Sequence, residues 1–164
     1  MLLIGKFVAM ACMLDGKHVS WLPSYGPEMR GGTANCSVIV SDEEVGSPLV
    51  DTADVIVAMN LPSLLKFEDK VKPGGVLVVN SSLIDRKVDR DDIQVVYCDA
   101  NHIAEEVGNP KGANVAILGA MLEKAPVVDL DTMVEAIRIE LGERKARFLE
   151  GNKKALLAGM EAAR

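Results

Sequence analysis

The chain has 164 residues, of which 49% are hydrophobic and 26% charged. This length suffices for one domain with a sizeable core, and the apolar fraction excludes intrinsic disorder. Eighteen lysines and arginines against 24 aspartates and glutamates leave a net charge of -6, which argues against a nucleic-acid partner, because phosphates need a basic face.

The charge is unevenly distributed along the chain. Residues 138–164 hold seven basic and four acidic side chains, a net charge of +3, so the remainder carries -9. Two interpretations stay open. The segment either docks on an acidic neighbour or forms a solvated helix of mixed charge, which is the commoner case.

The cysteines and the apolar start bear on metals, membranes and location. Cys12, Cys36 and Cys98 form no C-x-x-C pair, so we expect no metal site, and their odd number without a signal peptide favours reduced thiols in the cytoplasm. Lys6 interrupts the first 14 residues, a run shorter than the ~20 residues of a membrane span. We therefore expect a buried helix there.

The first quarter of the chain predicts a helix and two strands. The helix covers residues 1–15 and ends at Gly16, a strand covers 18–22, and another covers 34–41. Between the strands, residues 23–32 contain two prolines and three glycines, which argues against a helix or a central strand.

The middle of the chain predicts a parallel sheet. Apolar or β-branched strands are expected at residues 53–58, 76–79 and 93–98, with a turn at 73–75 and a charged loop at 85–92. Asn60 should cap a helix with Pro62 in its first turn. Such strands separated by helices indicate a parallel sheet covered on both faces.

The last 65 residues predict helices. They are expected at 100–107, 114–124, 131–141 and 144–163, with Asn114 and Asp131 as the capping residues of the second and third.

The loop over residues 24–32 is the segment with the clearest chemical potential. Its glycines permit close backbone approach, and Glu28 and Arg30 place opposite charges beside Tyr25. A loop that follows a strand of an open α/β sheet can reach a ligand in the crevice. A rigid surface turn with an internal ion pair is an equally good interpretation.

Other patterns are weaker. Residues 54–79 resemble part of a methyltransferase, but the Gly-rich turn of a nucleotide-binding fold is absent. His18 and His102 are isolated, and the acidic loop at 85–92 lacks the glycine and terminal glutamate of a calcium loop. No catalytic residue and no metal site is predicted.

Residues 21–36, WLPSYGPEMRGGTANC, resemble the signature of the gamma subunit of 2-oxoacid:ferredoxin oxidoreductases, most of all the 2-oxoglutarate type. The resemblance covers most of the chain and continues through shorter motifs: Ser47-Pro48, Asn80-Ser81-Ser82, Gly108-Asn109-Pro110 and Asn114.

The resemblance implies a fold, an activity and partners. The fold is a Rossmann-like parallel sheet flanked by helices, with a helical C-terminus, in a single domain over residues 1–164. The complex would oxidatively decarboxylate a 2-oxoacid with coenzyme A to acyl-CoA and CO2 and would reduce ferredoxin. The resemblance favours 2-oxoglutarate as the substrate. Alpha, beta and in some cases ferredoxin-like delta subunits would hold thiamine diphosphate, Mg2+ and iron–sulfur clusters. This chain would bind no cofactor, nucleic acid or membrane and would not be catalytic alone.

The sequence departs from the family pattern at its start. Family members usually begin with a strand and a Gly-x-Gly-Gly-Gln-Gly turn before the helix that here starts at Leu2, and this sequence shows neither. Three explanations of this difference stay open. Either the start codon was placed too far downstream, or the missing strand lies on another chain, or this branch of the family does without it.

The resemblance gives the loop two roles. In the first and favoured role the loop docks on a partner subunit, and in the second it contacts substrate or coenzyme A. Arg30 would pair with an anionic group, and Glu28 would orient Arg30 or a basic group of the partner. The loop candidates are Ser24, Tyr25, Gly26, Pro27, Glu28, Arg30, Gly31 and Gly32, and the secondary candidates are Asn80, Ser81, Ser82 and Asn114. The rival hypotheses are a free-standing nucleotide- or CoA-binding module and a methyltransferase-like domain.

Overall fold

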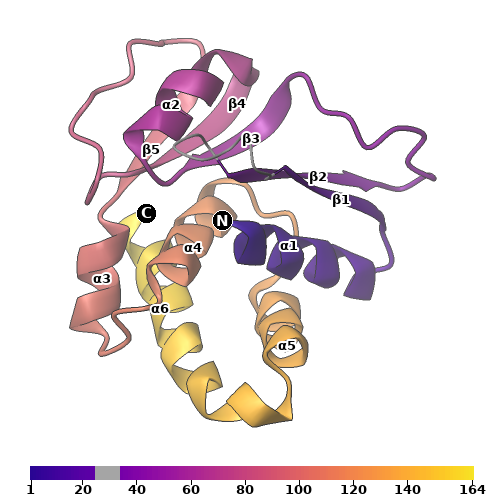
Figure 1. Cartoon of the computed structure of the whole chain (residues 1–164), viewed down its shortest axis with the longest axis vertical. Helices are drawn as coiled ribbons and strands as arrows, with labels where there is room; N and C mark the ends of the chain where they lie inside the picture. The colour runs from indigo at the N-terminus through magenta and orange to yellow at the C-terminus, as the bar shows by residue number, and fades with distance from the viewer. Residues whose placement is uncertain (25–33) are drawn as a thin grey trace. The chain divides into compact units, whose positions relative to one another are not determined.

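The computed structural model describes residues 1–24 and 34–164, which form two compact units (Figure 1). The first, here called the ribbon unit, comprises Met1–Val50 and Val127–Glu150. The second, the sheet unit, comprises Asp51–Pro126 and Gly151–Arg164.

Helix α1 (Leu2–Leu14) opens the ribbon unit and confirms the predicted helix. Its side chains are apolar nearly all round, and Phe7, Ala11 and Cys12 are fully buried. Gly16, at a φ of 81°, follows the helix in the left-handed conformation that favours glycine.

Strands β1 (His18–Ser24) and β2 (Asn35–Ser41) form a two-stranded antiparallel ribbon against α1. The prediction that a strand would end before Pro23 was wrong: Pro23 pairs with Cys36 in the register, and Ser24 with Asn35. A proline is tolerated there because a two-stranded ribbon leaves one edge of each strand without a ladder partner. The loop predicted for the crevice of a parallel sheet therefore follows a strand of this ribbon instead.

Helix α5 (Leu130–Leu141) packs against α1 within the ribbon unit. Its cap is Asp129, whose carboxylate accepts a hydrogen bond from the Thr132 N–H at 2.7 Å. The prediction of Asp131 as the cap was therefore wrong: Asp129 has the extended backbone of a cap, and Asp131 lies in the first helical turn. Gly142, at a φ of 66°, ends α5, and the 3-10 helix η3 (Glu143–Phe148) follows before α6 begins.

The sheet unit contains the predicted parallel sheet. Strands β3 (Ala53–Ala58), β4 (Val71–Asn80) and β5 (Gln94–Cys98) lie in the order β3-β4-β5 (Figure 1). Alternation places every second side chain of β4 on the same face. The apolar core on one face of the sheet consists of Ala58, Leu64, Val71, Leu77, Val79 and Ile84.

Helix α2 (Leu61–Phe67) joins β3 to β4 through the 3-10 helix η2 (Glu68–Lys70). Its start is as predicted: Asn60 caps it by accepting a hydrogen bond from the Ser63 N–H at 3.0 Å, with a proline in the first turn.

Strand β4 begins earlier than predicted. The expected turn at residues 73–75 lies inside the strand, where the ladder with β3 shifts register between Ala53 and Val55. A Cβ at Gly75 would lie 2.7 Å from the Asp54 carbonyl oxygen, so glycine permits this close approach. The irregular ladder accommodates a Pro-Gly-Gly segment that a regular central strand would exclude.

Three helices complete the sheet unit: α3 (Ala100–Glu106), α4 (Ala113–Lys124) and α6 (Leu149–Ala162), the last from Gly151 onward. Helix α4 contacts β4 and β5, and α6 crosses α4 at Gly119 and Gly159. Flanking helices and a helical C-terminus are thus confirmed. No helix in the described ranges is both long and apolar enough to cross a membrane.

Candidate functional site

Most of the predicted loop lies outside the described residues: Tyr25, Gly26, Pro27, Glu28, Arg30, Gly31 and Gly32. Ser24 is described; it ends β1 with an exposed side chain. Its register partner Asn35 begins β2, so the chain leaves and re-enters the ribbon at the same end.

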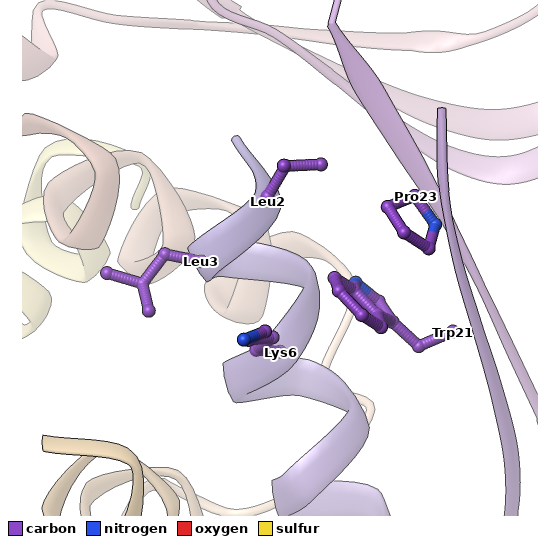
Figure 2. Close-up of a pocket in the computed structure, with 5 residues that line it drawn as sticks. All are labelled: Leu2, Leu3, Lys6, Trp21 and Pro23. Carbon is purple, nitrogen blue, oxygen red and sulfur yellow. The ribbon is translucent and has the colours of Figure 1, made fainter. Parts of the chain in front are cut away.

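An open pocket of about 450 Å³ lies beside this end of the ribbon, between α1 and β1. Figure 2 shows its lining: Leu2, Leu3 and Lys6 come from the helix, and Trp21 and Pro23 from the strand. The Lys6 ammonium lies 5.3 Å from the centroid of the Trp21 ring, within cation–π distance.

Gly5 allows the ribbon to approach α1 closely enough to form this pocket. A Cβ at position 5 would lie well inside van der Waals contact with the Cys36 sulfur and 2.9 Å from Trp21 Nε1. The Cys36 thiol points at the Met1 carbonyl oxygen, 3.8 Å away, and burial raises its pKa, so the group stays a neutral thiol. The contact between the ribbon and α1 is thus packed and uncharged at Cys36, and Lys6 is the one charged side chain in the pocket lining.

This lining suits binding and not bond-making. Three apolar side chains, an indole and one ammonium fit an apolar or flat group that carries a negative charge, or an apolar side chain of another protein. The lining offers no nucleophile with an adjacent base. Sequence reasoning missed Leu2, Leu3 and Lys6 as site residues, although Lys6 is visible in the sequence as the one charged residue of an apolar helix. It included Trp21 in the family motif but gave that residue no role in a site.

The secondary candidates Asn80 and Ser82 lie together at the carboxyl ends of β4 and β5. Asn80 is fully buried and donates hydrogen bonds to Asn101 Oδ1 at 3.0 Å and to the Met59 carbonyl at 3.5 Å. The Ser82 hydroxyl hydrogen-bonds the Asp99 carboxylate and accepts from the Asn101 N–H at 3.0 Å. Sequence reasoning missed Asp99 and Asn101. Both come just after the carboxyl end of β5, and Asn80 stands at the carboxyl end of the neighbouring strand β4.

This network is largely satisfied within itself. Ser81 contributes a backbone N–H that donates to the Cys98 carbonyl at 2.9 Å. The Asn80 amide oxygen accepts from the Ser82 N–H at 3.3 Å. The polar groups therefore join β4, β5 and α3, and a ligand would have to replace existing hydrogen bonds.

Asn114 does not join that network. It lies in the first turn of α4, whose cap is Gly112, and its amide oxygen accepts from the Val115 N–H at 2.9 Å. Asn114 was therefore wrongly predicted as the cap, because the helix starts one residue earlier than its pattern indicates.

The described residues do not fit a metal or an iron–sulfur cluster. No group of three or more His, Cys, Asp or Glu side chains is placed to hold a metal among them. The three cysteines are free, and burial raises the pKa of Cys98 to about 11 and also raises that of Cys12. Neutral, single thiols are poor ligands for iron, which requires thiolates.

The fold defines a domain of the α/β class, in which helices flank a parallel three-stranded sheet. The family model for pyruvate ferredoxin/flavodoxin oxidoreductase matches residues 1–162, and the chain belongs to this family.

Two kinds of relative are similar over most of the chain. Ketoisovalerate oxidoreductase subunit VorA of Methanothermobacter marburgensis is 39% identical over 162 residues, 98% of this chain and 34% of VorA. The 2-oxoglutarate synthase subunit KorC of the same organism is 35% identical over 143 residues, 84% of this chain and 75% of KorC. The chain thus spans about a third of VorA's length and most of KorC's.

Two solved structures are similar to this chain over nearly its whole length. The keto/oxoacid ferredoxin oxidoreductase gamma subunit from Geobacter sulfurreducens is 32% identical with a TM-score of 0.84, over 99% of this chain and 90% of that one. A chain of 2-oxoglutarate:ferredoxin oxidoreductase from Magnetococcus marinus is 26% identical with the same TM-score, 0.84, over 98% of this chain and 28% of that one. The predicted resemblance to the gamma subunit is confirmed.

Proposed function

We propose that this chain serves as the gamma subunit of a complex that oxidatively decarboxylates a 2-oxoacid with coenzyme A, yielding acyl-CoA and CO2 and reducing ferredoxin. The observation that carries the proposal is the match to the Geobacter sulfurreducens gamma subunit, which extends over 90% of that chain at 32% identity. Residues 1–164 would act as one gamma-subunit domain.

The chemistry belongs to partner subunits in this proposal. The described residues provide no set that fits a metal, and the pocket between α1 and β1 has no nucleophile with an adjacent base in its lining, where Lys6 is the one titratable side chain. We therefore expect thiamine diphosphate and Mg2+ in alpha and beta subunits, and iron–sulfur clusters in the beta subunit or in a ferredoxin-like delta subunit. This chain is expected to be inactive alone and to work in the cytoplasm.

The proposed role of the ribbon unit is docking. Leu2, Leu3 and Trp21 give the pocket an apolar wall at the end of the ribbon where Ser24 leads into residues 25–32. An apolar patch at the end of a ribbon whose connecting sequence contains Tyr25 and Arg30 has the composition of an interface centre. Direct contact with substrate or coenzyme A is the second role for these residues.

Two substrates follow from the two kinds of relative. We propose 2-oxoglutarate first, because KorC is named for it and this chain covers 75% of KorC's length. Ketoisovalerate is the alternative, favoured by the 39% identity to VorA.

Co-expression with alpha and beta subunits from the same organism tests the proposal. The purified complex should reduce ferredoxin only when a 2-oxoacid and coenzyme A are both present, and rates with 2-oxoglutarate, ketoisovalerate and pyruvate identify the substrate. A chain that purifies as a monomer with no thiamine-containing partner would contradict it.

A free-standing nucleotide- or CoA-binding module is the second candidate, favoured by the ammonium at the rim of the pocket. A rise in melting temperature of this chain alone with coenzyme A or ATP would support it. Equal melting temperatures with and without these ligands would leave the subunit proposal as the better one. The methyltransferase alternative would require tight binding of S-adenosylmethionine.

A further inference from the structure

The turn that joins α5 to α6 in the ribbon unit carries three cations and one carboxylate, Glu143, and is therefore basic on balance. All six residues of η3 (Glu143–Phe148) are exposed to solvent. We call Arg144, Lys145, Arg147 and Phe148 together the basic turn. In Figure 1 this segment is the stretch between the labelled helices α5 and α6.

The basic side chains of this turn lack the partners that the other described arginines have. Each of those others forms an ion pair with a carboxylate, at distances of 2.5–2.7 Å: Arg86, Arg90, Arg138 and Arg164. Arg144, Lys145 and Arg147 form no ion pair with any residue of the described ranges. Three neighbouring cations are thus available for carboxylates outside this chain.

Phe148 adds an apolar contact to these charges. Its side chain is 47% exposed, and the Arg147 guanidinium lies 4.8 Å from the centroid of its ring. Arginine and exposed aromatic side chains are enriched at protein interfaces, where a guanidinium stacked on a ring can still bind a carboxylate with its edge.

Backbone hydrogen bonds close the turn at both of its ends. Gly142 begins it at a φ of 66°, and the Lys145 N–H donates to the Gly142 carbonyl at 3.2 Å. The Leu149 N–H donates to the Ala146 carbonyl and leads directly into α6. Backbone hydrogen bonds of this kind reduce the entropy that a turn loses on binding.

We propose that the basic turn binds an acidic patch on another subunit of the same complex; this partner rests on the proposed function. The side chains of the turn favour a protein over a polyanion. Phosphates would be bound by the cations alone, whereas the half-exposed Phe148 ring beside the Arg147 guanidinium adds an apolar contact of the kind found at protein interfaces.

Charge reversal in the co-expressed complex tests the proposal. The double variant R144E/R147E should reduce co-purification with the partner subunits at least tenfold at low salt, and wild-type association should weaken as salt rises. The control K111E/K154E makes the same change in net charge at two exposed lysines that also form no ion pair, and it should co-purify normally. Melting temperatures of the isolated variants verify that both fold.

Three other results would overturn the proposal. Equal recovery of the complex with R144E/R147E and with wild type would show that the turn does not bind a subunit. Binding to phosphatidylglycerol vesicles or duplex DNA that R144E/R147E abolishes, with the complex intact, would assign the turn to a membrane or nucleic acid. A wild-type chain that recovers no partner subunit overturns this partner together with the proposed function, whereas the first two results leave that function standing.

Discussion

Trp21 is the residue on which the pocket depends, because its indole forms one wall and lies under the Lys6 ammonium. Its position follows from the absence of a side chain at Gly5, which lets both Trp21 and Cys36 reach the helix. This dependence is specific enough to test with a single methyl group.

Gly5→Ala should destabilise the ribbon unit. The new methyl group would overlap the Cys36 sulfur and lie 2.9 Å from Trp21 Nε1, so α1 and the ribbon would have to separate. Overpacking of this kind costs about 1–3 kcal/mol. Urea unfolding followed by the fluorescence of Trp21, the single tryptophan in the chain, measures the change.

Gly46→Ala is the matched control for that substitution. A Cβ at Gly46 meets no atom within 4 Å, and its φ is not positive, so its midpoint in urea should equal that of wild type or exceed it slightly. Equal stability of both variants would show that Trp21 and Cys36 do not depend on the missing side chain.

Cys98 gives the sheet unit a dependence on alkaline pH. Burial raises its pKa to about 11 from an ordinary value of 9.0, because the thiolate is disfavoured in the core. Since the folded-state pKa is the higher one, this stabilisation is complete below pH 9 and is lost as the pH rises through 11. Two pKa units correspond to about 2–3 kcal/mol.

Cys98→Ala should remove this dependence. Between pH 8 and pH 11 the free energy of unfolding of wild type should fall further than that of the variant, by up to about 2–3 kcal/mol. Lysine and tyrosine titrations affect both proteins equally, so urea unfolding at the two pH values isolates the thiol. Parallel losses in the two proteins would show that Cys98 titrates normally.

At the scale of elements, the sequence pattern predicted helices and parallel strands because apolar periodicity and β-branched runs reflect burial directly. Asn60 was found because a cap followed by proline is a local signal. Local signals failed where tertiary pairing decides. Residues 73–75 read as a turn but pair with β3 across an irregular ladder, and nothing in the strand at 18–24 indicated an antiparallel partner in place of the parallel sheet.

The crossing of α4 and α6 depends on two glycines. A Cβ at Gly119 would overlap the Leu156 carbonyl oxygen, and one at Gly159 would overlap that of Ala116. Gly119→Ala should therefore force the helices apart and lower stability by about 1–3 kcal/mol or more, because rigid backbone and not a flexible side chain must move.

Gly151→Ala, in the partner helix α6, provides the control. The nearest atom to a Cβ there is 3.5 Å away, an ordinary contact, so the helix should gain about 0.5–1 kcal/mol from the better helix former. Thermal unfolding followed by circular dichroism compares the two. Equal melting temperatures of Gly119→Ala and wild type would rule out a close backbone crossing.

At the scale of the whole molecule, the candidate site was predictable only in part. The motif drew attention to residues 24–32 and to Asn80 and Ser82, because glycines and strand-end polar groups are visible in a sequence. The pocket could not be predicted from the sequence, because it forms only where α1 and β1 lie side by side. That contact depends on the absence of a side chain at Gly5. Asp99 and Asn101 were missed for the same reason: their partners come from a neighbouring strand.

The proposed docking role of the pocket predicts an effect on assembly without an effect on folding. Leu3→Glu places a carboxylate in the pocket at a side chain that is already 41% exposed, so the isolated chain should keep its melting temperature. Leu157→Glu makes the same change on α6 at a leucine that is 42% exposed. A buried, unpaired carboxylate at an interface costs several kcal/mol, so Leu3→Glu should reduce recovery of the complex at least tenfold while Leu157→Glu leaves it unchanged. If the Leu3→Glu complex instead assembles normally and only its KM for coenzyme A rises, the pocket contacts the ligand, because a carboxylate there would repel its phosphates without affecting the subunits.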